Sequence, residues 1–307
     1  MTEQPIPAPA TPSSPTALRP GSSTGATAPT VRFERASLRY RDRIVWSDLS
    51  LACEPGSFTA ILGPNGAGKT SLLKVILGLS PVSEGRVEVL GREPRRGDPG
   101  IGYVPQHQSF DRDLPLRGRD LVRLGVDGHR WGIGRSSPAI ERAVDAAIES
   151  VEAGAFAAAP IGRLSGGEQQ RLRIAQALVG DPRLLLCDEP LASLDLRHQQ
   201  EITDLIGGWQ RRTGGTVLFV THDVNPVLPL VDRILFVVNG RWAAGTPDEV
   251  LTSERLTELY GSHVDVLRVH GRVLVVGETT DSGFDLEEPH HLPVIDDEPG
   301  GLGSGPA

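Results

Sequence analysis

The chain has 307 residues, a length typical of about two domains, and its 39 acidic and 31 basic side chains give a formal charge of −8. This acidic balance argues against sequence-independent DNA binding, which needs a basic face. The two cysteines, Cys53 and Cys187, favour a reducing cytosol, and without a long apolar run or a signal-peptide pattern we expect no membrane span and no secretion signal.

The two ends of the chain differ in composition from its middle. Residues 1–30 consist mostly of Pro, Ala, Thr and Ser, and residues 278–307 are rich in Glu, Asp, Gly and Pro. Segments with so little apolar surface cannot offset the entropy lost on ordering. We therefore predict a disordered N-terminal tail and an acidic disordered C-terminal tail.

Between the tails, short β-rich runs alternate with helical patterns, an order typical of an α/β layer with a parallel sheet. Four-residue apolar runs at 184–187 and 217–220 suit strands that are buried on both faces. In chain order we expect strands over 31–40, 57–62, 86–90, 184–187, 217–220 and 234–238, and helices over 69–77, 140–158 and 168–179.

Residues 63–70 match the phosphate-loop pattern G-x-x-x-x-G-K-[ST], between an apolar run and a helical pattern as that motif requires. Its glycines let backbone N–H groups turn inward around an anion, and the following helix adds its positive N-terminal end. Lys69 would reach the β- and γ-phosphates, the Thr70 hydroxyl would bind Mg²⁺, and Ser71 could donate to a phosphate oxygen. The predicted nucleotide-binding residues are Gly63, Pro64, Asn65, Gly66, Ala67, Gly68, Lys69, Thr70 and Ser71.

A second candidate anion site lies at residues 164–171, which read Leu-Ser-Gly-Gly-Glu-Gln-Gln-Arg at the start of a predicted helix. One chain does not need two phosphate cradles for one nucleotide, whereas two chains that share two nucleotides do. The segment resembles the signature sequence of ABC-type ATPases, here Leu164, Ser165, Gly166, Gly167 and Glu168. Glutamine is the commonest family residue at the fifth position, and a carboxylate there favours the helix dipole.

Four further segments, and one aromatic residue, resemble motifs of the same family and follow in its order between residues 31 and about 250. Tyr40 stands where the family places a ring against adenine, although Phe33 and Trp46 are nearby rings. The similar segments are the Q-loop at 103–106 with Gln106, the Walker B strand at 184–189 with Asp188 and Glu189, the D-loop with Ser193, Leu194 and Asp195, and the switch histidine His222.

The resemblance implies a role for each of these residues. Glu189 would orient and deprotonate the attacking water, and His222 would stabilise charge on the γ-phosphate. Gln106 would sense the metal and the water. Ser165 and Gly167 would contact the γ-phosphate of the nucleotide bound by the other subunit. The implied catalytic set is thus Glu189, His222 and Gln106, and the implied Mg²⁺ ligands are Thr70, Gln106 and Asp188.

The resemblance also implies the ABC ATPase fold, an α/β fold with a RecA-like P-loop core and a parallel sheet. An N-terminal antiparallel β layer and an inserted helical subdomain, at about 107–170, complete it. We expect the ATPase domain to span 31–255 and a C-terminal β-hairpin extension to span 256–277.

Among ABC ATPases, a transport subunit fits the chain best. Only 119 positions separate Lys69 from Asp188, too few for the long heptad arm of a repair ATPase, and no second ATPase copy is present as in ribosome-acting members. We expect a homodimer that uses ATP and Mg²⁺ at the cytoplasmic face of the membrane, with a separate permease, a solute-binding protein and no nucleic acid. A soluble, non-transport ABC regulator or repair factor is the alternative.

The sequence indicates the transported substrate less strongly than it indicates the ATPase family. The segment after the Q-loop, residues 222–229, and the ending at 259–261 before a Val-rich hairpin resemble importers of zinc and manganese. An importer of ferric siderophores or cobalamin is the alternative. A permease helix is expected to dock on residues 106–123, where Phe110, Leu114, Leu116 and Leu121 lie among arginines, unless those leucines only close the core of the helical subdomain.

Overall fold

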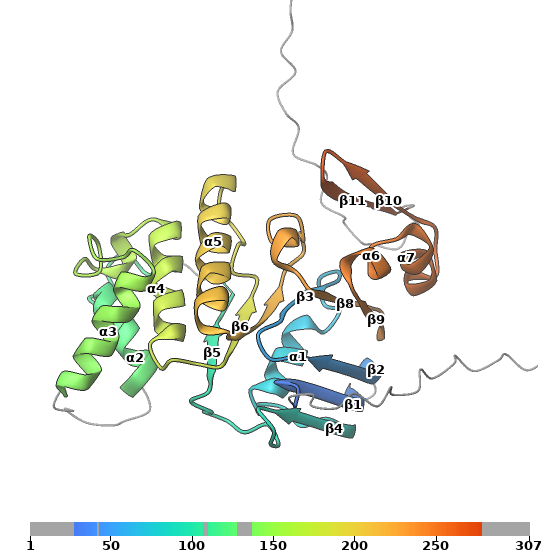
Figure 1. Cartoon of the computed structure of the whole chain (residues 1–307), viewed down its shortest axis with the longest axis horizontal. Coiled ribbons are helices and arrows are strands. Elements are labelled where there is room, and N and C mark those ends of the chain that lie inside the picture. Colours follow the sequence, from blue (N-terminus) through green and yellow to red (C-terminus); the bar gives the residue numbers. More distant parts are fainter. Residues whose placement is uncertain (1–27, 42, 107–109, 128–136, 278–307) are drawn as a thin grey trace, which may run out of the picture. The chain divides into compact units, whose positions relative to one another are not determined.

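The structure, a computed structural model, describes residues 28–41, 43–106, 110–127 and 137–277 (Figure 1). It divides into two compact units, residues 1–250 and 251–307. Most of the predicted N-terminal tail and the whole predicted C-terminal tail lie outside the described residues.

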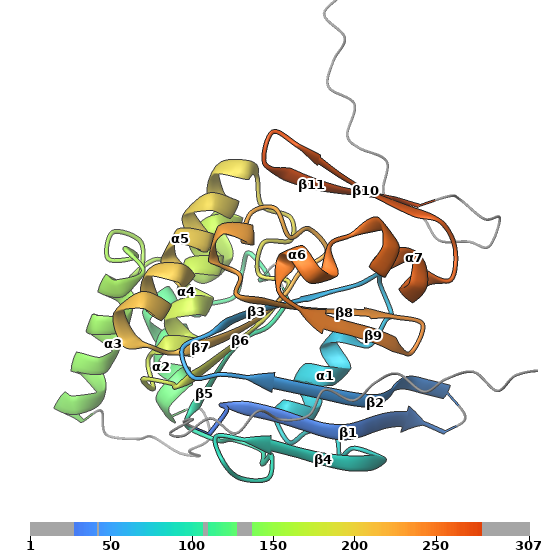
Figure 2. The same ribbon diagram turned by 45° about the vertical axis from the view of Figure 1, so that its right-hand side comes forward.

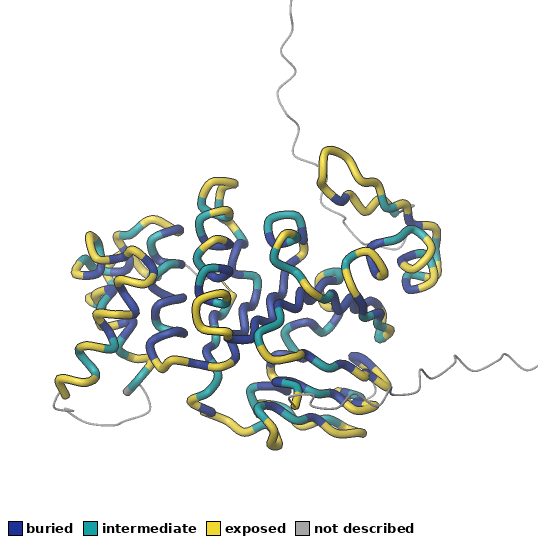
Figure 3. The backbone as a smooth tube through the Cα atoms, viewed as in Figure 1, coloured by how far each residue is buried: buried dark blue, intermediate teal, exposed yellow. Residues whose placement is uncertain are grey.

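A six-stranded sheet forms the centre of the first unit (Figure 2). Five neighbouring strands are parallel, and the last strand joins the edge in antiparallel orientation. Three of the parallel strands are buried over their whole length, as expected where both faces of a sheet are covered (Figure 3). In spatial order the strands are β5 (Ile101–Val104), β6 (Leu184–Asp188), β7 (Thr216–Val220), β3 (Phe58–Leu62), β8 (Arg233–Val238) and β9 (Arg241–Gly245).

A second, three-stranded antiparallel sheet is built from the N-terminal part of the chain. Along its first strand, buried and exposed positions alternate with irregularities where the strand pairing shifts register. The buried side chains share one hydrophobic core with the central sheet. The strands, in spatial order, are β2 (Arg43–Cys53), β1 (Val31–Tyr40) and β4 (Glu84–Val89).

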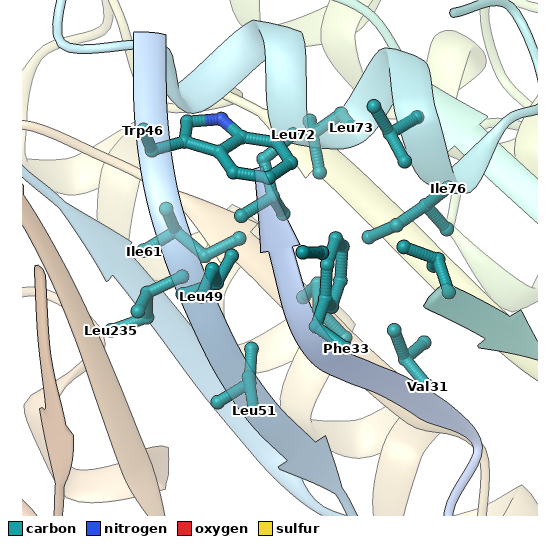
Figure 4. Packing of buried hydrophobic residues seen from close by; sticks show 14 of the residues in the cluster. Val31, Phe33, Trp46, Leu49, Leu51, Ile61, Leu72, Leu73, Ile76 and Leu235 are labelled. Atoms are coloured by element: carbon teal, nitrogen blue, oxygen red, sulfur yellow. The ribbon is translucent and has the colours of Figure 1, made fainter. Parts of the chain in front are cut away.

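Helix α1 (Lys69–Ile76) contributes to the core between these two sheets (Figure 4). Its apolar residues Leu72, Leu73 and Ile76 are fully buried in the same cluster as Phe33 and Trp46. The two aromatic rings meet edge to face, with centroids 6.0 Å apart. This packing fixes the start of α1 relative to the end of β3, and the phosphate loop connects those two points.

Three helices pack against one another at one end of the first unit (Figure 1): α2 (Gly118–Asp127), α3 (Pro138–Ser150) and α4 (Gly166–Leu178). The helix predicted over 140–158 is wrong in its second half. It starts at Pro138, capped by the Ser137 side chain, and ends at Ser150, because Glu152 adopts a left-handed conformation with φ of 56°. The central parallel sheet, the antiparallel sheet and this helical group confirm the predicted α/β architecture.

The remaining described helices of the first unit lie between strands of the central sheet, between α3 and α4, or after β9. The longest of them, α5 (Leu196–Thr213), runs between β6 and β7 and was not expected from the sequence. The short ones are the 3-10 turns η1 (Ile161–Arg163) and η2 (Leu228–Leu230), and α6 (Pro247–Val250).

The second unit consists, in its described part, of one helix and one hairpin. Helix α7 (Ser253–Tyr260) is capped by the Thr252 hydroxyl, which accepts from the Arg255 N–H. Strands β10 (Val264–Val269) and β11 (Arg272–Gly277) pair in antiparallel orientation. None of the helices in the described residues of either unit has the length and apolar character needed to cross a membrane.

Candidate active site

The phosphate-loop segment follows β3 and leads directly into α1. Gly63 and Gly68 have φ values of 142° and 99°, which residues other than glycine rarely adopt. A Cβ atom at Gly63 would lie 2.0 Å from the Val237 carbonyl oxygen, and one at Gly68 would lie 2.3 Å from the Val45 side chain. The loop therefore needs glycine at both positions, for conformation and for space.

Lys69, the first residue of α1, is almost fully buried. Its ammonium donates to the carbonyl oxygens of Gly63 at 2.6 Å and Pro64 at 3.1 Å. Burial lowers the pKa of Lys69, while the carboxylates of Glu189 and Asp188 oppose that shift. A desolvated cation enclosed by a glycine loop at a helix start has the chemistry of an anion site.

Asp188 is the last residue of β6 and is also buried. It accepts hydrogen bonds from the Thr70 hydroxyl at 3.2 Å and the Tyr103 hydroxyl at 3.4 Å. Burial raises the pKa of Asp188, and the bond from Thr70 works against the shift. Burial of the Tyr103 hydroxyl, and then the neighbouring Asp188 carboxylate, raise the pKa of Tyr103 to about 12, so the tyrosine remains a donor. No pattern in the sequence singled out Tyr103 for this contact.

Glu189 follows Asp188 with a left-handed φ of 48°, an uncommon conformation for a side chain of this kind. Its N–H donates to the Val220 carbonyl of the neighbouring strand at 3.0 Å. The carboxylate lies 3.8 Å from the Lys69 ammonium and accepts from the Gln106 amide at 3.3 Å. The Glu189 carboxylate thus lies between Lys69 of the phosphate-loop segment and Gln106. Strain of this kind is concentrated at functional sites.

Lys69, Gln106 and Glu189 line a cavity of about 450 Å³, together with residues of the phosphate loop. Tyr40 lies at it, with its hydroxyl 3.2 Å from that of Ser80, whereas the alternative rings Phe33 and Trp46 are buried in the core. Arg43, which sequence reasoning missed, donates to the Gly66 carbonyl at 3.2 Å. The lining residues are Tyr40, Arg43, Val45, Asn65, Gly66, Gly68, Lys69, Thr70, Ser71, Gln106 and Glu189.

The signature segment lies at the start of α4 and is not part of this lining. Ser165 and Glu168 form a reciprocal cap. The Ser165 hydroxyl accepts from the Glu168 N–H at 3.3 Å, and the Glu168 carboxylate accepts from the Ser165 N–H at 2.8 Å. The carboxylate also accepts from the Ser165 hydroxyl at 2.8 Å. Glutamate at this position therefore fixes the serine that precedes the helix.

The D-loop segment leads into α5 and lies beside the signature segment of the same chain. Asp195 caps α5 by accepting from the His198 N–H at 2.9 Å, and the His198 ring nitrogen Nδ1 lies 2.8 Å from both carboxylate oxygens. These bonds lower the pKa of Asp195. A Cβ atom at Gly167 would lie only 2.5 Å from the His198 ring. Only the spacing of Asp195 and His198, typical of a helix cap, could have drawn attention to this histidine.

His222 follows β7 and is exposed. Val220, two positions earlier, pairs with Asp188, so His222 lies at the same end of the sheet as the acidic residues. His222 is not one of the described residues that line the cavity around Lys69.

In the structure, some residues of the expected docking segment are buried or paired within the chain, and others are partly exposed. Leu121 is buried and is therefore not available as a docking contact, because the apolar side of α2 packs on α4. The Phe110 ring lies under the Arg173 guanidinium, 4.4 Å from the ring centroid. Arg119 pairs with Glu141 and Asp145 of α3. Leu114 and Leu116 remain partly exposed.

Comparison with known proteins relates this chain to membrane transport. Residues 46–192 match the ABC transporter family model. The chain is 35% identical over 239 residues to the zinc import ATP-binding protein ZnuC of Halorhodospira halophila, covering 77% of this chain and 85% of that protein. It is 37% identical over 239 residues to the zinc transport system ATP-binding protein TroB of Treponema pallidum, covering 78% and 90%. A solved structure described as a metal-chelate type ABC transporter, inward-facing, matches with a TM-score of 0.69 at 26% identity, covering 81% and 97%.

Proposed function

The chain belongs to the ATP-binding subunits of ABC transporters, enzymes that hydrolyse ATP, and from this premise we propose that it powers import of zinc or manganese through a separate membrane permease. One observation supports the proposal that this site hydrolyses ATP: Lys69, Glu189 and Gln106 line a single cavity beside Asp188. The zinc part is supported by the names of the two relatives, and manganese by the sequence resemblance. An importer of ferric siderophores or cobalamin is the second candidate, and a soluble non-transport ATPase the third.

The loop residues and Lys69 would bind the phosphates of ATP, and Tyr40 would stack on its adenine. The Thr70 hydroxyl and the Asp188 carboxylate, 3.2 Å apart, bring two hard oxygen ligands together, a donor set suited to Mg²⁺. We assign the metal to these two residues and Gln106. When bound, Mg²⁺ supplies positive charge that offsets the charge on the phosphates.

Glu189 is the group we assign as general base. As the oxygen of a water molecule attacks the γ-phosphorus, its proton passes to the Glu189 carboxylate, and the bond to the ADP oxygen breaks. Gln106 orients this carboxylate through the 3.3 Å bond from its amide. Lys69 and His222 stabilise negative charge on the transferred phosphoryl group.

The signature residues lie outside the cavity, and we propose that a second copy supplies them. In such a homodimer Ser165, Gly167 and the start of α4 would approach the γ-phosphate bound by the partner. The D-loop residues Ser193, Leu194 and Asp195 would lie at the same interface. The reciprocal cap of Ser165 and Glu168 would hold the serine in position for this contact.

We place this homodimer on the cytoplasmic face of the membrane, attached through the permease and supplied by an extracytoplasmic solute-binding protein, with no nucleic-acid partner. The exposed residues around Leu114 and Leu116 are the proposed contact with the permease. We assign the ATPase domain to residues 31–255, with the helical subdomain at about 107–170 and a hairpin extension at 256–277.

Reconstitution with the permease encoded by a neighbouring gene tests the proposal. Vesicles containing the complete transporter should take up zinc or manganese only with ATP, and the Glu189→Gln variant should not support uptake. Uptake of a ferric siderophore or cobalamin, with no metal uptake, would establish the second candidate instead. A protein that hydrolyses ATP but associates with no permease would favour the third.

A further inference from the structure

Arg43 is a cation at the candidate active site to which none of the sequence motifs assigns a role. It pairs with Tyr40 across the hairpin of β1 and β2, and residues directly opposite each other in antiparallel strands project to the same side of the sheet. Both residues line the cavity around Lys69. The hairpin therefore presents a positive charge beside the ring that we assign to adenine.

The guanidinium of Arg43 is held against the phosphate loop. Its Nη2 atom donates to the Gly66 carbonyl at 3.2 Å, and Gly66 lies in the middle of the loop with φ of 77°. An arginine side chain has five N–H donors, so most of them remain available for a ligand. Arg43 forms no ion pair with a carboxylate of the described residues. Its charge is therefore not neutralised by that part of the chain.

The contacts of the other cavity residues indicate which part of a nucleotide Arg43 would face. The Lys69 ammonium lies 3.8 Å from the carboxylate of Glu189, the assigned general base, so these two groups mark the γ-phosphate end. Tyr40 marks the adenine end, and Arg43 lies opposite it in the hairpin while it contacts the loop at Gly66. Between these ends lie the ribose and the two phosphates that remain in ADP.

We propose that Arg43 binds the phosphates that ATP and ADP share, an inference that rests on the proposed ATPase function. Phosphate oxygens are strong acceptors, and the planar guanidinium can donate two parallel N–H bonds to them. Because the contact does not involve the γ-phosphate, it persists after hydrolysis. Arg43 thus strengthens the binding of ADP as much as that of ATP, and it opposes release of the product.

The test is calorimetry of ATP and ADP binding to the full-length protein, without Mg²⁺ so that ATP is not consumed. Arg43→Ala should weaken the binding of both nucleotides by the same factor, about tenfold. The matched control is Arg39→Ala, which removes an equally exposed class of charge from the same hairpin. Arg39 precedes Tyr40 in β1, so it projects to the opposite side of the sheet, and it does not line the cavity. Both affinities should stay within about twofold in this control.

Two further substitutions separate a phosphate contact from simple support of the loop. Arg43→Lys keeps the positive charge and should retain part of the affinity that alanine loses, although it lacks the planar fork. Arg43→Gln keeps an amide donor for the Gly66 carbonyl but no charge, so it should bind both nucleotides as weakly as Arg43→Ala. Wild-type affinity in Arg43→Gln would reduce the role of Arg43 to holding the loop and would overturn the proposal.

Two other results also overturn it. A loss confined to ATP would place the guanidinium at the γ-phosphate, and unchanged affinity for both nucleotides in Arg43→Ala would exclude a phosphate contact. Neither result affects the proposed ATPase function, which fails only if the wild-type protein does not bind and hydrolyse ATP.

Discussion

Gly167→Ala tests the contact between the signature and D-loop segments within one chain. Gly167 is the second residue of α4, and an added Cβ would lie 2.5 Å from Cδ2 and 3.1 Å from Cγ of the His198 ring. The ring cannot simply move aside, because its Nδ1 is 2.8 Å from both carboxylate oxygens of Asp195. The methyl group therefore displaces the ring from Asp195 or shifts the start of α4.

The magnitude follows from two opposing effects. Inserting a methyl group into a filled space costs about 1–3 kcal/mol, whereas replacing glycine by alanine in a helix gains up to about 1 kcal/mol. The single variant should thus lose up to about 3 kcal/mol of unfolding free energy. In a His198→Ala background the overlap is absent, and the same substitution should gain up to about 1 kcal/mol.

The assay is urea unfolding of four proteins: the wild type, each single variant and the double variant. The coupling between the two sites should be about 1–3 kcal/mol, well above the additivity expected for independent sites. If Gly167→Ala changes the unfolding free energy equally in both backgrounds, the ring does not oppose the methyl group and the reasoning is wrong.

Four further variants address the proposed chemistry and coupling. Glu189→Gln keeps the shape of the side chain but cannot accept a proton, so hydrolysis should fall by about 10²–10⁴-fold, and light scattering with ATP and Mg²⁺ should detect a stable dimer rather than a monomer. Lys69→Ala removes the cation that faces the loop carbonyls; ATP affinity, measured by calorimetry, should fall by about 10–100-fold, and unchanged affinity would exclude the assigned phosphate contact. Leu114→Asp should leave the ATPase rate of the isolated protein within about twofold and abolish metal uptake by the assembled transporter. A parallel loss of both would place Leu114 in the core of the helical subdomain instead, and Phe110→Ala is the weaker form of this test because Phe110 packs under Arg173.

Local requirements explain why the sequence alone predicted the phosphate loop and the main parallel strands. A left-handed glycine and a run buried on both faces each depend on residues close together in the chain, so they leave a readable pattern. Gly63 and the run at 184–187 are examples, and each has the expected conformation in the structure. The reciprocal cap of Ser165 and Glu168 was not predicted, and α4 starts at Gly166 rather than at 168.

Helix α5 was missed because its own sequence argues against it. Gly207 and Gly208 lie in its interior, where adjacent glycines usually indicate a turn. A Cβ atom at Gly207 would lie 2.7 Å from the Leu230 side chain. The glycine thus serves a packing contact with a segment more than twenty positions away, and no local pattern records such a contact.

The same distinction applies to the candidate site. Residue types and spacing indicated Lys69 and Thr70, since phosphate chemistry restricts which side chains can serve, and the resemblance to ABC-type ATPases added Asp188 and Glu189. Only the tertiary structure revealed that Tyr103 donates to Asp188, that His198 fills the space beside Gly167, and that Leu121 is buried. These contacts join residues from different strands and helices, and they depend on the order of strands in the sheet, which periodicity along the chain does not encode.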